Sequence, residues 1–353
     1  MGSILPSATP RSTARPDRAS GDAINLDDVN TSMPPRRSTA LPRRTAVIGA
    51  AATIAAATLL TACSTDESTT DDGPCAPAAA SKDDGSRSIG IPDAEVTLQS
   101  PGSDPAPLRR TPSIESAQRV RLETSSVEAS LVPAGDGRQE AKTTEQQLVT
   151  PLTARTVCDD ESSTEFTVGT PTSKDDELSA LLPALDGSTG GLSFSDRMTP
   201  TRLRLKPREE SESPARSALE QSLISALDYT VPLPTDPVGP GATWRSVRTV
   251  SAAATVTQTM TVTLAARRGD VLDLRVDVDE VPVNAIFTIP GSTSRLHINR
   301  YSMSGSGTVT VDLNRVFPVG GGLTLRGARE LVGDDPDQPL IQRNEFTLAW
   351  KRS

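Results

Sequence analysis

The chain has 353 residues, with 36 lysines and arginines against 45 aspartates and glutamates, and aromatic residues make up only 3% of it. A net charge of -9 argues against binding to phosphate backbones, and the scarcity of aromatic rings argues against base-stacking or sugar-stacking clefts. The acidic excess is larger beyond residue 62, because residues 1–62 hold 7 basic and 4 acidic residues and leave 29 against 41.

The first predicted element is an uncharged, alanine-rich run at residues 45–62, which follows Arg43 and Arg44. Its length reaches only the lower limit for a transmembrane helix. A basic start, a modest apolar run and a small residue before the break are typical of a secretory signal peptide, which we predict for residues 33–62. The run ends in LTAC at residues 60–63, which resembles the lipobox of bacterial lipoproteins. That resemblance implies cleavage between Ala62 and Cys63 and lipid on the Cys63 thiol.

Alternatives remain open in this region. The apolar run could be an uncleaved anchor helix that ends in an incidental cysteine. Residues 1–32 have the polar composition of a disordered lead-in, but translation could instead begin at Met33, which would give a leader of ordinary length. Arg43 and Arg44 could belong to a twin-arginine export signal, although no Phe or Leu follows where such signals usually carry one. With two or more acyl chains on Cys63, attachment to the outer face of the cytoplasmic membrane would be firm.

Residues 63–93 are predicted to be a disordered tether that carries the lipid at its start, because Ser, Thr, Asp, Gly, Pro and Ala leave little to bury. Two further cysteines are Cys75 in this tether and Cys158 beyond it. Outside the cytoplasm an even pair favours a disulfide, although two free thiols are the alternative. Residues 94–353 would then form a β-rich extracytoplasmic domain, in one piece or as two related halves.

Most of this domain alternates between apolar and polar residues, as strands do. The predicted strands before the central region cover residues 118–132, 147–157 and 163–169, and those after it cover 285–289, 294–303, 306–313 and 343–351. Between them, residues 255–281 predict a hairpin with its turn at Arg268-Gly269-Asp270, where glycine allows the bend. That triplet is also an integrin-binding motif, but the turn is the better interpretation. The expected fold is a large curved antiparallel sheet or half-barrel with one or two helices packed on one face.

Two segments have helical periodicity. Ser213 is a predicted N-cap with Pro214 at the first helical position. Leu219, Leu223 and Leu227 then fall on one apolar stripe, which is either core or a ligand-facing surface. A shorter helix is predicted at residues 174–182, ended by Pro183.

The longer helix is followed by PLPTDPVGPGATW at residues 232–244, and Trp244 enters the next strand. This helix, the pattern P-L-P-x-x-P-V-G-x-G-A-x-W and the long strands resemble a family of β-rich actinobacterial surface lipoproteins of unassigned function. The resemblance covers residues 213–278 and implies no activity. Trp244 is predicted to fill the junction between helix and sheet rather than to stack on a ligand. A more distant likeness, of architecture alone, is to lipid-carrier lipoproteins with a half-open β fold.

Sequence motifs for catalysis, metals or cofactors do not emerge. The single histidine, His297, lies in a predicted strand without a nucleophile motif nearby, and it is expected on the sheet surface. The acidic stretches at Asp159-Asp160 and Asp334–Asp337 lack the spacing of a calcium loop. The triplet at Gly320–Gly322 has no following Lys-Ser/Thr, so it is predicted to be a flexible turn.

These observations favour a lipid-anchored, non-enzymatic protein that binds a hydrophobic ligand such as a lipid or glycolipid between the sheet and the longer helix. A structural or interaction lipoprotein of the cell envelope, with a filled core, is the alternative. A hydrolase that uses paired carboxylates is a third possibility. A carrier should show a contiguous apolar cavity, an interaction protein a filled core, and a hydrolase two converging carboxylates in a cleft.

Overall fold

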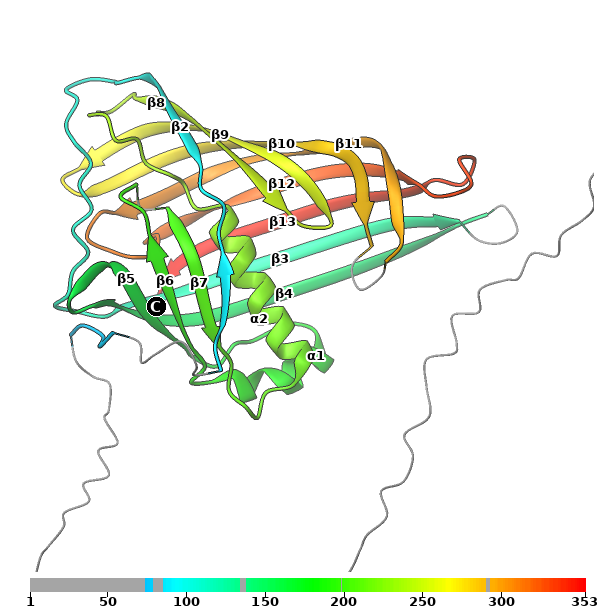
Figure 1. Cartoon of the computed structure of the whole chain (residues 1–353), viewed down its shortest axis with the longest axis horizontal. Helices are drawn as coiled ribbons and strands as arrows, with labels where there is room; N and C mark the ends of the chain where they lie inside the picture. The colour runs from blue at the N-terminus through cyan, green and yellow to red at the C-terminus, as the bar shows by residue number, and fades with distance from the viewer. Residues whose placement is uncertain (1–73, 79–84, 134–137, 198, 290–292) are drawn as a thin grey trace, which may run out of the picture. The chain divides into compact units, whose positions relative to one another are not determined.

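Alternating side chains build a single sheet in which every neighbouring pair of strands is antiparallel (Figure 1). The computed structural model describes residues 74–78, 85–133, 138–197, 199–289 and 293–353, all within the compact unit Glu67–Ser353. The predicted fold class, a curved antiparallel sheet with few helices, is confirmed.

The strands, in chain order, are β1 (Arg87–Gly90), β2 (Glu95–Ser100), β3 (Gln118–Pro133), β4 (Gln139–Val157), β5 (Asp160–Val168), β6 (Thr189–Phe194), β7 (Pro200–Lys206), β8 (Thr243–Ser251), β9 (Ala254–Arg268), β10 (Val271–Thr288), β11 (Arg295–Asp312), β12 (Gly320–Val332) and β13 (Leu340–Arg352). The helices are α1 (Asp176–Leu181), a 3-10 turn at Leu182–Leu185, and α2 (Ser213–Asp228).

The strand order is β1-β7-β6-β5-β4-β3-β13-β12-β11-β10-β9-β8-β2, so β1 and β2 lie at opposite edges although they follow each other in the chain. Only residues 91–94 join them, and such a connection spans at most about 18 Å. The sheet therefore curves until its two edges approach each other at that end. Within the described residues β1 and β2 do not pair with each other, and the sheet remains open.

The β9–β10 hairpin illustrates how the sequence sets the two faces. On β10, Leu272, Leu274, Val276 and Val278 are buried, while the intervening Asp273 and Asp277 point to the outer face. Gly269 has φ 62°, the left-handed conformation that the turn to β9 requires. The predicted hairpin and its turn are thus confirmed.

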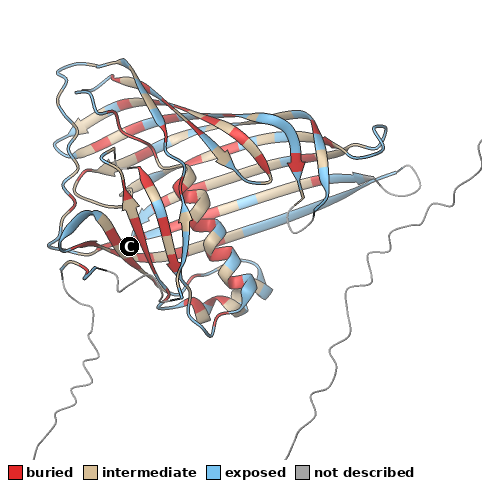
Figure 2. Cartoon of the chain, viewed as in Figure 1, coloured by how far each residue is buried: buried red, intermediate tan, exposed pale blue. Residues whose placement is uncertain are grey.

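Helix α2 lies across the inner face of the sheet and buries its predicted apolar stripe there (Figures 1 and 2). Leu219, Leu223 and Leu227 are at most 4% exposed and belong to the core. The predicted cap is wrong by one residue: Glu212 has the extended N-cap conformation and its side chain makes no capping hydrogen bond, while Ser213 is already helical.

The shorter helix, α1, differs more from the helix predicted at residues 174–182. Asp175 caps α1 by accepting hydrogen bonds from the backbone amides of Glu177 and Leu178. Pro183 does not end the structure but sits in the following 3-10 turn, near whose start its missing N–H costs no internal bond.

Two large hydrophobic clusters fill the inner side of the sheet. One lies beneath α2 and includes Leu203, Leu219 and Trp350, and the other surrounds Trp244. Trp244 is fully buried, and its indole N–H donates to the carbonyl of Pro232 at 2.9 Å. Its predicted role in the core is confirmed, with the proline-rich segment packed over it.

Several predicted boundaries are wrong. The domain does not begin at residue 94: β1 lies inside the predicted tether, and Ile91 is buried in the core. The separate strands predicted at 294–303 and 306–313 form one strand, β11, because the polar residues between them continue its pairing with β10. The strands β2, β6, β7 and β12 were not predicted, and Gly320–Gly322 begins β12 rather than forming a turn alone. The separate strand predicted at 285–289 is the end of β10. The described strands form one sheet.

Candidate functional site

An open groove runs along the inner face between α2 and the β8–β9 turn. Two adjoining cavities, of about 390 Å³ and about 290 Å³, lie in it and share Ser126, Glu128, Ser225 and Phe346. The larger cavity has α2 on one side and Ala252–Ala253 of the β8–β9 turn among its other lining residues. We call these two cavities the polar groove.

The floor of the polar groove holds a closed cluster of polar side chains from three neighbouring strands. Arg329 on β12 donates to Glu128 on β3 at 2.8 Å and to Gln342 on β13 at 2.6 Å. Gln342 in turn donates to Glu128 at 2.8 Å and to Ser130 at 3.1 Å. The Arg329 guanidinium also lies 4.4 Å from the centre of the Phe287 ring. The charges in this cluster are therefore mutually compensated.

A second cluster surrounds the buried carboxylate of Glu280 on β10. It accepts hydrogen bonds from Tyr229 at 2.8 Å, Tyr301 at 3.2 Å and Gln258 at 3.1 Å. Burial, and then the neighbouring Glu280 charge, raise the pKa of both tyrosines. Both phenols are thus held protonated, as donors to the carboxylate.

The same cluster continues to the end of α2 through Arg248 on β8. The Arg248 guanidinium donates to Gln258 at 2.8 Å, to the carbonyl of Thr230 at 3.2 Å and to the carbonyl of Asp228. Since the last carbonyls of a helix lack partners within it, a cation at this position stabilises the helix end. The inner face is therefore fastened to the C-terminal end of α2 by polar contacts as well as by packing.

Asp228 is the clearest pH-sensitive group in this region. Burial raises the pKa of its carboxyl to about 6, against the opposing effect of Arg248. A carboxyl with a raised folded-state pKa contributes stability that is fully present below pH 4 and is lost as the pH rises through 6.

We expect Asp228→Asn to remove that loss of stability. The free energy of unfolding of the variant should exceed that of the wild type by about 1 kcal/mol at pH 7 and by little or nothing at pH 4. Urea unfolding of both proteins between pH 4 and 7.5 measures the difference directly. A difference that shrinks as the pH rises would contradict the assignment.

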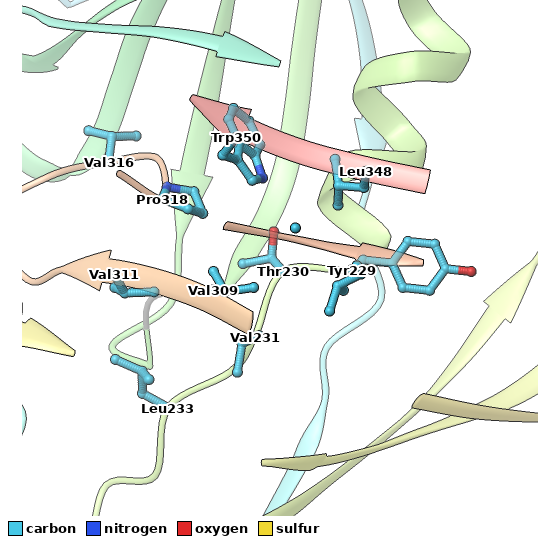
Figure 3. Close-up of a pocket in the computed structure, with 12 residues that line it drawn as sticks. Tyr229, Thr230, Val231, Leu233, Val309, Val311, Val316, Pro318, Leu348 and Trp350 are labelled. Atoms are coloured by element: carbon cyan, nitrogen blue, oxygen red, sulfur yellow. The ribbon is translucent and has the colours of Figure 1, made fainter. Parts of the chain in front are cut away.

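Beyond Tyr229 lies a small apolar pocket of about 30 Å³ (Figure 3). Val231, Val309, Leu348 and Trp350 are among the residues that line it. The Tyr229 ring stacks on Phe346 with centroids 5.4 Å apart. Tyr229 is among the lining residues of both this inner pocket and the polar groove, so the two spaces adjoin at this residue.

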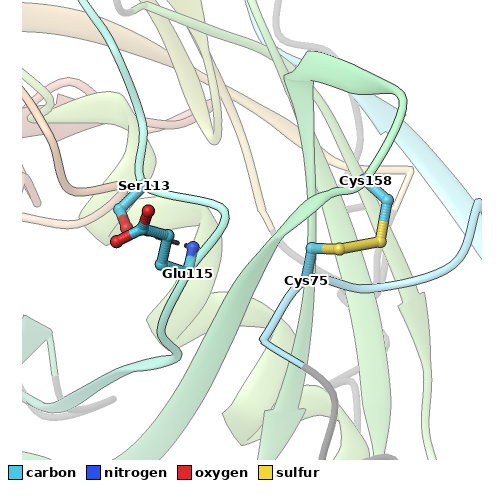
Figure 4. The surroundings of a disulfide bond; sticks show 4 residues. All are labelled: Cys75, Ser113, Glu115 and Cys158. Atoms are coloured by element: carbon cyan, nitrogen blue, oxygen red, sulfur yellow. Dashed lines mark hydrogen bonds between the residues drawn. A yellow bond between two sulfur atoms is a disulfide. The ribbon is translucent and has the colours of Figure 1, made fainter.

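The residues predicted as functional sites lie in different parts of the structure, and some lie outside the described residues. Ala62 and Cys63, together with the signal peptide and the lead-in, lie outside the described residues. Cys75 and Cys158 form the predicted disulfide, which fastens the described segment 74–78 to the turn between β4 and β5 (Figure 4). The backbone adds to this link, because the amide of Cys158 donates to the carbonyl of Ala76 at 2.9 Å. Leu219, Leu223, Leu227 and Trp244 are core residues rather than a ligand-facing surface.

The remaining candidates are on the periphery. His297 is exposed on β11, opposite Ile286 and Val332, as predicted for a sheet-surface residue. In the β12–β13 turn, the Asp335 carboxylate accepts from the amide of Asp337 at 3.0 Å and from Gln338 at 2.9 Å. Within the described part of the chain, acidic, histidine and cysteine side chains do not gather into a group that could hold a metal ion.

The polar clusters were missed by sequence reasoning, although a signal for them exists. On β3 the inward positions run from Val120 and Leu122 to Thr124, Glu128 and Ser130, so the same face changes from apolar to polar along the strand. A similar change occurs on β10, where Glu280 follows Val278.

Comparison with known protein families and with curated proteins gives no match for this chain. Among the described residues, no helix combines the length and the hydropathy needed to cross a bilayer. The apolar run at 45–62 is not among the residues described.

Proposed function

We propose that the protein is a non-enzymatic, lipid-anchored binding protein on the outer face of the cytoplasmic membrane. Its ligand is an amphiphile, a lipid or glycolipid, held between α2 and the inner face of the sheet. The observation that carries the proposal is the meeting of a polar groove and an apolar pocket at Tyr229. The lipobox and signal-peptide patterns support the anchor, and the actinobacterial lipoprotein resemblance supports the surface location.

The size of the inner pocket requires a movement on binding. At about 30 Å³ it has room for little more than a water molecule, which is far from the contiguous apolar cavity expected of a carrier. Rotation of the Tyr229 ring away from Phe346 would join the pocket to the polar groove. The Glu280 carboxylate would still accept hydrogen bonds from Tyr301 and Gln258, so the movement leaves no buried charge without a donor.

The Glu128 carboxylate in the groove and the Glu280 carboxylate beside it give no support to the hydrolase alternative. Both Glu128 and Glu280 already accept several hydrogen bonds from fixed side chains. A general acid or a nucleophile needs a carboxyl that is free to exchange a proton or to attack.

The test is native mass spectrometry, followed by organic extraction, of the full chain with Cys63→Ser, produced in an actinobacterial host. A bound lipid at partial occupancy is the expected result for this protein, because the closed inner pocket must open to admit the acyl chain. Tyr229→Ala should raise the occupancy several-fold by opening the inner pocket, while the matched Tyr229→Phe, which keeps the ring, should change it by less than about twofold. An empty protein in all three forms, with no thermal shift on addition of envelope lipids, would contradict the proposal.

An envelope interaction protein is the second candidate, and the filled hydrophobic clusters favour it. Three apolar side chains near the end of β10, Val281, Val283 and Ile286, are 56%, 55% and 46% exposed. If the protein is recovered without lipid, the interaction function would be favoured over lipid binding.

A further inference from the structure

Three neutral side chains in the polar groove have hydrogen-bonding capacity that the fold does not use. Ser126 on β3, Gln146 on β4 and Asn344 on β13 line the groove, and among the described residues their side chains have no hydrogen-bond partner. Each can both donate and accept. Ser126 and Gln146 are exposed to solvent, so a ligand can reach them.

The charges around these side chains argue against an anionic ligand. The cation among the lining residues, Arg329, is already bound to Glu128 and Gln342. Glu345 is paired with Arg326 at 2.9 Å. A phosphate or sulfate in the groove would therefore face the Glu128 carboxylate without a free cation to compensate it.

A cationic ligand is also poorly matched. The Glu128 carboxylate accepts hydrogen bonds from Arg329, Gln342 and Ser130, so most of its capacity is occupied. The groups that remain free are neutral amides and a hydroxyl, which match the hydroxyl groups of a neutral ligand.

The groove also contains an apolar wall. Phe346 lines both cavities, and Tyr229 packs against one face of its ring. An aromatic ring beside a few neutral polar groups is a common arrangement in small-molecule sites. The larger cavity, about 390 Å³, falls within the ~300–1,000 Å³ typical of such sites.

We propose that the polar groove is a subsite for a neutral saccharide headgroup, bound by Ser126, Gln146 and Asn344 beside the Phe346 ring. This inference rests on the proposed function, because it specifies the polar half of the amphiphile. It makes Gln146 and Asn344 residues that select a hydroxylated headgroup over a charged one.

Isothermal titration of the full chain with Cys63→Ser, below the critical micelle concentrations, tests the inference with four probes of equal chain length. These are octyl glucoside, octyl galactoside, octyl sulfate and 1-octanol. At least one glycoside should bind ten or more times more tightly than octanol, and octyl sulfate should bind no more tightly than octanol. The double variant Gln146→Ala/Asn344→Ala should weaken glycoside binding at least tenfold and leave octanol binding unchanged.

Thr347→Ala, on the outer face of the same β13 strand, is the matched control and should leave all four affinities unchanged. If octyl sulfate binds more tightly than both glycosides, or the double variant binds the glycosides as the wild type does, the saccharide subsite is wrong while the proposed function stands. If octanol binds and the glycosides bind no more tightly than octanol, the saccharide subsite is again wrong while the proposed function stands. If none of the four probes binds, the proposed function fails together with the subsite.

Discussion

Replacing Trp244 by alanine is expected to lower the free energy of unfolding by about 4 kcal/mol. The side chain is fully buried within one of the two large clusters, beside Val238 and Ala242 of the proline-rich segment. Its loss removes the largest apolar surface at this junction and leaves the carbonyl of Pro232 without its indole donor. Urea unfolding followed by circular dichroism measures the change.

Two further variants make the Trp244 result specific. Trp244→Phe keeps an aromatic ring but not the N–H, so we expect a smaller loss, about 2 kcal/mol. Val283→Ala removes an apolar side chain that is 55% exposed, and should change stability by less than about 0.5 kcal/mol. If Trp244→Ala costs no more than Val283→Ala, then Trp244 does not hold the segment to the sheet.

Removing the disulfide by Cys75→Ser/Cys158→Ser is expected to cost about 4 kcal/mol, because the bond closes a loop of 83 residues in the unfolded chain. The loop contains β1 to β4, and therefore strands from both edges of the sheet. The measurement is urea unfolding of the triple variant Cys63→Ser/Cys75→Ser/Cys158→Ser beside Cys63→Ser alone, which keeps the disulfide. Equal midpoints for the two proteins would contradict this expectation.

The sequence predicts best those strands whose inward face is apolar throughout. The half of the β9–β10 hairpin nearest its turn, from Met260 to Val278, is of this kind. So is the second half of β13, where Phe346, Leu348 and Trp350 alternate with Thr347 and Ala349. β6 is different, because two of its six residues are glycines and the ring of Phe166 packs where a side chain at Gly190 would lie. Its strand conformation depends on its partners β5 and β7 rather than on its own residues.

The candidate site was less predictable than the fold, for a geometric reason. Glu128, Arg329 and Gln342 come from three strands, and β3 lies about two hundred residues from its neighbour β13 in the chain. Their meeting depends on strand order and register, which alternation within one strand does not contain. The disulfide could be predicted without the fold, because two cysteines remain once Cys63 is assigned to lipid and an extracytoplasmic location is expected.

The position of β1 and β2 has a consequence for how the chain folds. Of the strands that the structure describes they are synthesised first, yet β1 pairs with β7 and β2 with β8, each more than a hundred residues further along. Contacts that close long loops form late, so the earliest segments of this domain are among the last to find their partners. Until they do, the exposed edges of β7 and β8 can pair with other chains. We therefore expect the folding domain to be prone to aggregation until β1 and β2, which residues 91–94 join, have paired with β7 and β8.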